Sequence, residues 1–150
     1  MTIDYLGKPA QAEIILYLPT QPIMPDDGKV DIPSLIELNG NHWRKIFSIY
    51  AKLCVQRGSW QEYRDQQLLT SRQAISFKDQ LYDKNAIHII AGKASWHRLD
   101  LNPETFKALD NKGLSHSTDS EKGTLLLTPY PDYRQFPNIL VEQIRQHLYS

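Results

Sequence analysis

The chain has 150 residues, of which 41% are hydrophobic, and its 17 Lys and Arg residues are balanced by 17 Asp and Glu residues. This length suits one compact domain, so we expect residues 1–150 to form a single unit. The even charge excludes a protein that holds a polyanion through its overall field, so any contact with nucleic acid has to be local.

Cysteine usage and hydropathy bear on the cellular compartment. Cys54 is the only cysteine, which excludes an internal disulfide and is typical of a reducing environment. No apolar run approaches the roughly 20 residues that cross a bilayer. The first 13 residues also lack the basic start and apolar centre of a signal peptide. We therefore expect a cytoplasmic protein without membrane contact.

The first half of the chain contains one clear strand and one clear helix. Residues 13–18 form a short apolar run closed by Pro19, which predicts a buried strand. Residues 19–33 hold four prolines and three aspartates and predict a long surface loop. Apolar residues then recur at helical spacing through residues 39–58, ending at Gly58, which predicts an amphipathic helix.

The middle of the chain alternates between polar and apolar segments. Residues 59–85 are polar and periodic, and they predict either one helix broken near Thr70 or two helices in succession. Residues 86–91 form a continuous apolar run, which is typical of a strand covered on both faces in a parallel sheet. Residues 92–97 then turn sharply into a short helix.

The last third begins with the least regular part of the sequence. Residues 106–109 form a weak strand candidate, and residues 111–123 read as a flexible polar connection. Residues 124–128 predict a third buried strand. Residues 136–149 then predict a helix, with Pro137 suited to its first turn.

Strands separated by helices predict an α/β fold of three layers, with a short, mainly parallel sheet flanked by helices. In parallel sheets, ligands bind beyond the carboxyl ends of the strands. Three predicted strands end at Leu18, Ala91 and Leu127, and each is followed by a loop of unusual chemistry. If these strands are parallel neighbours, the three loops meet at one edge of the sheet.

The loop at residues 128–138 is the strongest candidate for a binding site, because its three prolines stiffen it. We expect it to hold two tyrosines, an acid and an arginine at the mouth of a cleft, with three polar residues opposite. Two alternatives stay open: Asp132 and Arg134 form a local ion pair, or the two tyrosines pack against the last helix. The predicted ligand-binding residues are Tyr130, Asp132, Tyr133, Arg134, Gln21, His42 and Lys93.

Other kinds of site find little support in the sequence. The five histidines never show a ligand-pair spacing, so we expect no metal site, and no cofactor motif is present. His88 alternates with isoleucines in a predicted strand and is expected to be a hydrogen-bonded core residue. No serine or cysteine nucleophile motif accompanies His97 and Asp100.

A family resemblance adds to this interpretation. The helix that starts at residues 41–46, the strand ending in Gly92-Lys93-Ala94 and the strand ending in Pro129-Tyr130-Pro131 together resemble the uracil-DNA glycosylase superfamily, in its mismatch-specific branch. The resemblance covers residues 13–54 and 86–149 in outline. It implies a glycosylase-like fold, a pocket for a flipped base and N-glycosidic bond hydrolysis.

The first loop departs from that family's pattern. The family uses a polar Asn or Asp and a glycine there, whereas this chain has Pro19-Thr20-Gln21-Pro22, and Gln21 cannot act as a carboxylate base. We therefore expect local binding of a nucleobase or nucleic acid with reduced or no glycosylase activity, and leave open whether the protein is an enzyme. The alternative is a non-enzymatic module that contacts a protein partner through residues 128–138.

Overall fold

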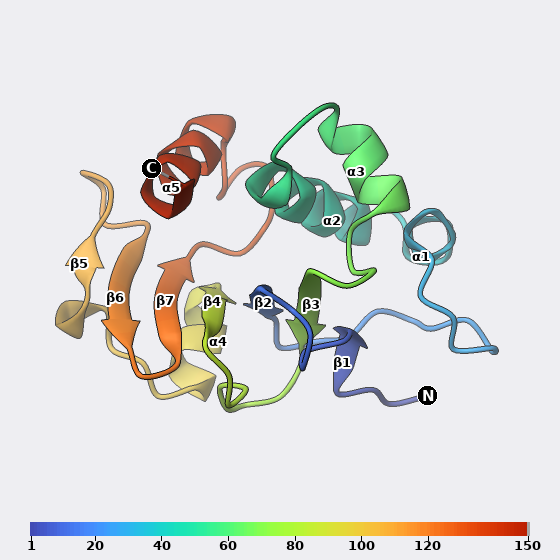
Figure 1. The fold of residues 1–150 in the computed structure, drawn as a ribbon, viewed down its shortest axis with the longest axis horizontal. Coiled ribbons are helices and arrows are strands. Elements are labelled where there is room, and N and C mark those ends of the chain that lie inside the picture. Colours follow the sequence, from blue (N-terminus) through green and yellow to red (C-terminus); the bar gives the residue numbers. More distant parts are fainter. Residues whose placement is uncertain (150) are drawn as a thin grey trace.

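The computed structural model describes residues 1–149, which form one mixed seven-stranded sheet with helices packed against it (Figure 1). The strand order across the sheet is β1-β3-β2-β4-β7-β6-β5. The strands are β1 (Tyr5–Gly7), β2 (Ile14–Tyr17), β3 (Gln73–Ser76), β4 (Ala86–Ala91), β5 (Lys107–Ala108), β6 (His116–Ser120) and β7 (Gly123–Thr128). The α-helices are α1 (Ile32–Asn39), α2 (Asn41–Cys54), α3 (Trp60–Gln66), α4 (Lys93–Arg98) and α5 (Asn138–Tyr149).

The four central strands of the sheet are parallel, and its edges are antiparallel. β3, β2, β4 and β7 run in the same direction, whereas β1 pairs antiparallel with β3 and the β7-β6-β5 edge is antiparallel throughout. The α/β class is thus confirmed, but the sheet is mixed rather than mainly parallel. The physical reason is the short connection between β6 and β7, because such a hairpin can join only antiparallel strands.

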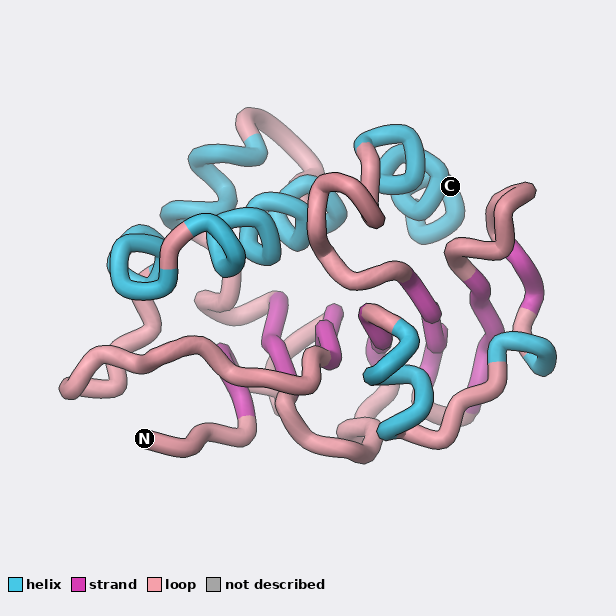
Figure 2. The backbone as a smooth tube through the Cα atoms, turned by 180° about the vertical axis from the view of Figure 1, so that it is seen from behind, coloured by secondary structure: helices cyan, strands magenta, loops and turns pink. Residues whose placement is uncertain are grey.

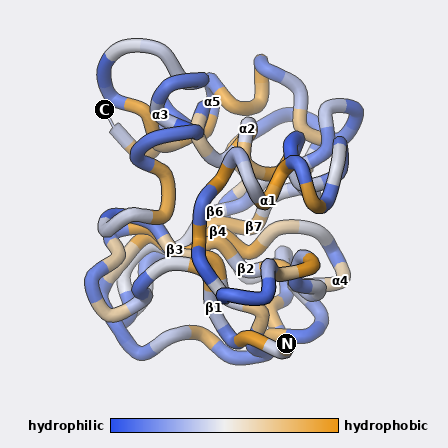
Figure 3. Tube along the Cα trace, turned by 90° about the vertical axis from the view of Figure 1, so that its right-hand side faces the viewer, coloured by the Kyte–Doolittle hydropathy of each residue, from blue (hydrophilic) through white to orange (hydrophobic). Residues whose placement is uncertain are grey.

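The central strands are apolar because both of their faces are covered. Ile14 and Leu16 of β2 belong to one hydrophobic cluster, whereas Ile15 and Tyr17 belong to the other. Side chains of a strand alternate between faces, so the continuous apolar run serves both clusters at once. Figure 3 shows the hydrophobic segments gathered around β4 and β7 in the middle of the molecule.

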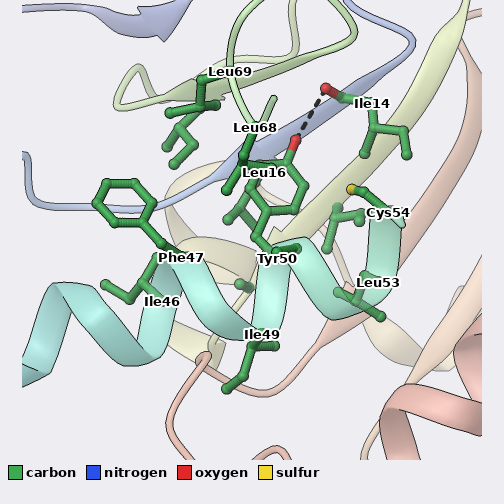
Figure 4. Close-up of a cluster of buried hydrophobic side chains, with 14 of the residues drawn as sticks. Ile14, Leu16, Ile46, Phe47, Ile49, Tyr50, Leu53, Cys54, Leu68 and Leu69 are labelled. Carbon is green, nitrogen blue, oxygen red and sulfur yellow. Dashed lines mark hydrogen bonds between the residues drawn. The ribbon is translucent and has the colours of Figure 1, made fainter. Parts of the chain in front are cut away.

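Four helices cover the first face of the sheet. In Figures 1 and 2, α1, α2, α3 and α5 lie together on one side of the strands. Figure 4 shows Tyr50 of α2 at the centre of this core, where its hydroxyl donates to the carbonyls of Ile14 at 3.0 Å and Ala74 at 2.9 Å. Burial raises the pKa of Tyr50 well above its usual value, so the phenol stays a donor. Tyr50 thereby fixes α2 over β2 and β3.

The second face is covered by α4 and by loop segments. Trp96 of α4 packs against Ile15, Tyr17 and Ile90, and it is almost fully buried. Its indole Nε1 donates to the carbonyls of Ile90 at 2.9 Å and Thr128 at 3.1 Å. These bonds reach the ends of β4 and β7, so α4 is held close to the carboxyl ends of the central strands.

Most strongly patterned segments have the predicted structure. The strands expected at 13–18, 86–91 and 124–128 are confirmed as β2, β4 and β7. The helices expected within 39–58, 92–97 and 136–149 are likewise confirmed as α2, α4 and α5, and the weak strand candidate at 106–109 contains β5. Cys54 is a free, buried thiol whose pKa is raised by burial.

Three segments differ from the expectation. The second helix expected within 59–85 is wrong, because β3 lies there and pairs with both β1 and β2. Residues 111–123 are not a flexible connection, because β6 pairs along them with β7. The loop expected at 19–33 ends two residues early, since Asp31 caps α1 by accepting from the Ser34 backbone N–H.

No helix within residues 1–149 combines the length and the apolar character that crossing a membrane requires.

Candidate functional site

The loops that follow β2, β4 and β7 meet at one edge of the sheet. β2 and β4 are parallel neighbours with Tyr17 opposite Ile90, and β4 and β7 are parallel neighbours with Ala91 opposite Thr128. The three carboxyl ends are therefore side by side, as the sequence predicted. This edge is the place where parallel sheets carry their ligands.

A cavity of about 670 Å³ lies at this edge, on the side of β4 and β7. Its volume is within the range of small-molecule sites. Three cationic side chains line the cavity, and none of the described lining residues is acidic. The lining residues are Gly92, Lys93, Ala94, Trp96, Lys112, Gly113, Leu114, Pro129, Tyr130, Arg134, Gln135 and Pro137.

The three cations come from separate segments of the chain. Lys93 begins α4, Lys112 lies in the turn before β6, and Arg134 lies in the loop before α5. All three residues are exposed, and within residues 1–149 no salt bridge engages their side chains. The fold thus directs three like charges to one cavity without a compensating carboxylate, which favours an anionic ligand.

Tyr130 forms the wall between this cavity and α2. Its hydroxyl shares a hydrogen bond of 2.9 Å with Nε2 of His42, and the two rings stack with centroids 5.7 Å apart. Burial raises the pKa of Tyr130, and the nearby charge of Asp132 raises it further, so the hydroxyl stays protonated. His42 therefore supports Tyr130 from behind and does not itself line the cavity.

Gly92 lets the chain pass close to the Tyr130 ring. Its φ of +86° lies in the region that only glycine adopts without strain. A Cβ at this position would lie 3.3 Å from Cδ2 of Tyr130. The glycine is thus required both by the backbone turn out of β4 and by the packing of the cavity wall.

Asp132 and Tyr133 face α2 and are not part of the cavity lining. The carboxylate of Asp132 lies 3.8 Å from Nζ of Lys45 and accepts from the backbone N–H of Arg134 at 2.9 Å. Among the described residues, the local ion pair of Asp132 with Arg134 that the sequence left open as an alternative is not formed. Tyr133 is 45% exposed and lies under Nζ of Lys45 and Lys52, at 5.7 and 5.5 Å from its ring centroid.

Gln21 has a structural role at the N-terminus. Its side-chain oxygen accepts from the N–H of Ile3 at 2.8 Å, and its amide nitrogen donates to the carbonyl of Met1 at 2.7 Å. It does not line the cavity. The expectation that Gln21 faces the ligand is therefore not met, because these backbone groups occupy its side chain.

Sequence reasoning missed Lys112, Trp96 and Leu114 as lining residues. Lys112 and Leu114 lie in a turn that Asp110 organises, since its carboxylate accepts from the backbone N–H groups of both residues. An aspartate followed by Asn-Lys-Gly is a turn signal, and it could have shown that this segment is ordered. Trp96 carried no such signal, because an apolar residue in a short helix reads as core.

A second cavity, of about 440 Å³, lies at the opposite ends of the central strands, and its lining includes Glu13, Asp119 and Lys84. Its charges are mixed, and Nζ of Lys84 already donates to the carbonyl of Ala10 at 3.0 Å. Sites in parallel sheets lie at the carboxyl ends of the strands rather than at this end. We therefore take the cationic cavity as the candidate site. Among the described residues, no three acidic, histidine or cysteine side chains gather as metal ligands.

The chain was compared with models of protein families. A family of unknown function, DUF6942, matches residues 4–149, so the chain belongs to this family. Comparisons with curated proteins and with solved structures gave no match.

Proposed function

We propose that this member of the DUF6942 family binds a small anionic molecule with a planar ring, a nucleotide, in the cavity beyond β4 and β7. The observation that carries the proposal is the meeting of Lys93, Lys112 and Arg134 at a cavity that no described carboxylate lines. Lysine and arginine side chains form charge-assisted hydrogen bonds with phosphate oxygens, and these are the stronger kind of hydrogen bond.

The apolar part of the lining suits the ring of such a ligand. Ala94, Leu114, Pro129 and Pro137 present apolar surface beside the three cations. One face of the Tyr130 ring is covered by His42, so a nucleobase would pack on the apolar wall rather than between two aromatic rings. Pockets with apolar walls and a few directed polar groups are typical of small-molecule sites.

The glycosylase-like fold is part of this proposal. Three loops that follow parallel strands and surround one edge agree in outline with that resemblance. We propose binding without glycosidic bond hydrolysis, because Gln21 of the first loop is held by backbone groups of Met1 and Ile3. A uracil-containing single-stranded DNA incubated with the protein should release no uracil. Release above the buffer rate, lost in Tyr130→Ala, would overturn this part of the proposal.

Calorimetric titration with uridine and adenosine 5′-monophosphate tests the binding. We expect each of the variants Lys93→Ala, Lys112→Ala and Arg134→Ala to weaken binding about tenfold, since a hydrogen bond to a charged group contributes about 1.5–3 kcal/mol. Arg57→Ala and Lys29→Ala are matched controls, because both residues are exposed and lie outside the cavity lining. Equal affinity in all five variants, or equal binding of phosphate-free uridine, would refute the proposal.

The protein-contact alternative requires residues 128–138 to present an open surface. Tyr133 fits that requirement because it is 45% exposed beside Lys45 and Lys52 of α2. Tyr130 and Arg134, in contrast, line a cavity, which favours the small ligand. Tyr133→Ala separates the two functions: it should leave nucleotide affinity unchanged, whereas it would weaken capture of a protein partner.

A further inference from the structure

A groove of about 190 Å³ adjoins the cationic cavity along α5. Lys112, Leu114 and Pro137 line both the cavity and the groove. The groove lies between the turn that precedes β6 and the first turns of α5, where Ile139 and Leu140 contribute its apolar side. A ligand in the cavity can therefore extend into the groove past Lys112 without crossing another element.

The apolar side of the groove is unusually exposed. Ile139 is 70% exposed and Leu114 is 37% exposed, although both are large aliphatic residues. Leu140 beside them is buried in the main core and forms a fixed base. The groove leads out of the ligand cavity and has exposed aliphatic side chains on both sides. An apolar chain would cover such a surface.

Asp110 adds a negative charge to the groove, whose other charged lining residue is Lys112 at the junction with the cavity. The Asp110 carboxylate accepts from the N–H groups of Leu114 at 2.9 Å and Ser115 at 2.8 Å. Burial alone would raise the pKa of Asp110, but these hydrogen bonds lower it, so the group is ionised at neutral pH. A continuing chain of phosphates would be repelled here, whereas an uncharged chain would not.

We infer that the ligand is a nucleotide whose phosphate carries an apolar chain, with the phosphate at Lys112 and the chain along Leu114 and Ile139. This inference rests on the proposed nucleotide site and adds the chemical class of the ligand's second part. The main support for this inference is the position of Lys112 at the junction of cavity and groove. A phosphodiester bound there keeps one negative charge for Lys112 and directs its ester group into the groove.

The test compares the methyl and hexyl esters of uridine 5′-monophosphate, which carry the same charge and differ by five methylene groups. Calorimetry should give about tenfold tighter binding of the hexyl ester, because part of its chain leaves water. In Leu114→Ser and Ile139→Ser this gain should fall several-fold. The methyl ester should bind as before in Ile139→Ser, because Ile139 does not line the cavity, whereas Leu114→Ser should also weaken binding of the methyl ester. Both residues are exposed, so these variants should fold.

Leu38→Ser is the matched control, because Leu38 is 46% exposed on α1, away from the groove. It should keep the full gain. Methyl ester binding without a gain for the hexyl ester, or a gain that survives in both groove variants, would overturn the inference while leaving the nucleotide site intact. Failure of both esters to bind would overturn the nucleotide site together with the inference.

Discussion

Replacing Tyr17 by Phe should destabilise the protein, because it removes the hydrogen bond at the centre of the second face of the sheet. Tyr17 is 1% exposed, and its hydroxyl lies 2.6 Å from Nδ1 of His88. The other ring nitrogen of His88 lies 3.0 Å from the carbonyl of Lys84 and 2.9 Å from that of Lys122. Carbonyls only accept, so Nε2 carries the proton, Nδ1 accepts, and Tyr17 donates.

The size of the effect follows from the groups that lose a partner. In Tyr17→Phe the Nδ1 of His88 is left unpaired in a fully buried ring, and the N–H of Tyr82 loses its acceptor at 3.0 Å. An unsatisfied buried polar group costs about 1–3 kcal/mol, and the half-buried Tyr82 N–H adds a smaller part. We therefore expect the free energy of unfolding to fall by about 2–3 kcal/mol.

Urea denaturation followed by circular dichroism measures this loss. Tyr133→Phe is the matched control, because Tyr133 is 45% exposed and should change stability by less than about 0.5 kcal/mol. If Tyr17→Phe lowers the free energy of unfolding no more than Tyr133→Phe does, the Tyr17 hydroxyl does not stabilise the fold through His88. The tautomer assigned to His88 would then also be wrong.

Three further predictions concern pH, backbone conformation and the thiol. Burial lowers the pKa of His88, so its contribution to stability is complete above the usual histidine pKa of about 6.5 and is lost as the pH falls through the lowered value. The urea midpoint should therefore drop more between about pH 7 and 5 in the wild type than in His88→Gln. Equal drops in the two proteins would contradict this prediction. Gly92→Ala should lower the free energy of unfolding by about 2 kcal/mol, because Gly92 has a φ of +86° and lies close to the Tyr130 ring. Thermal unfolding measures this loss. Gly58→Ala is the control that separates backbone strain from the clash, because Gly58 has a similar φ and a Cβ there would meet no neighbour. Cys54 should react with a thiol reagent only after unfolding, because burial raises its pKa; rapid reaction of the native protein would disprove its placement.

The sequence was sufficient for strands whose apolar run is continuous and for long amphipathic helices. β4 and β7 stand out because both of their faces are buried. β3 does not, since it contains only two apolar residues, and the side-chain amide nitrogen of its buried Gln73 donates to the hydroxyl of Tyr63 of α3 at 2.6 Å. That partner is ten residues away, so no local pattern could reveal it.

The strand β6, which lies between β7 and the edge strand β5, was missed for a different reason. β6 is almost entirely polar, and it forms because β7 supplies a ladder of backbone partners from His116 to Ser120. Pairing of this kind depends on a neighbouring strand rather than on side-chain hydropathy. The same limit applied to the candidate site. Lys93, Tyr130 and Arg134 were predicted from strand ends, whereas placing Lys112 required the pairing of β6 with β7 to be known.

The central claim is that an anion binds at the carboxyl ends of β4 and β7. Titration of ¹⁵N-labelled protein with uridine 5′-monophosphate tests it most directly, because each backbone amide reports its own position. We predict saturable chemical-shift changes at Gly92, Lys93, Lys112 and Arg134, which are reduced in Arg134→Ala. Changes confined to Glu13, Asn85 and Ser120 at the opposite end of the strands, or none at all, would contradict the claim.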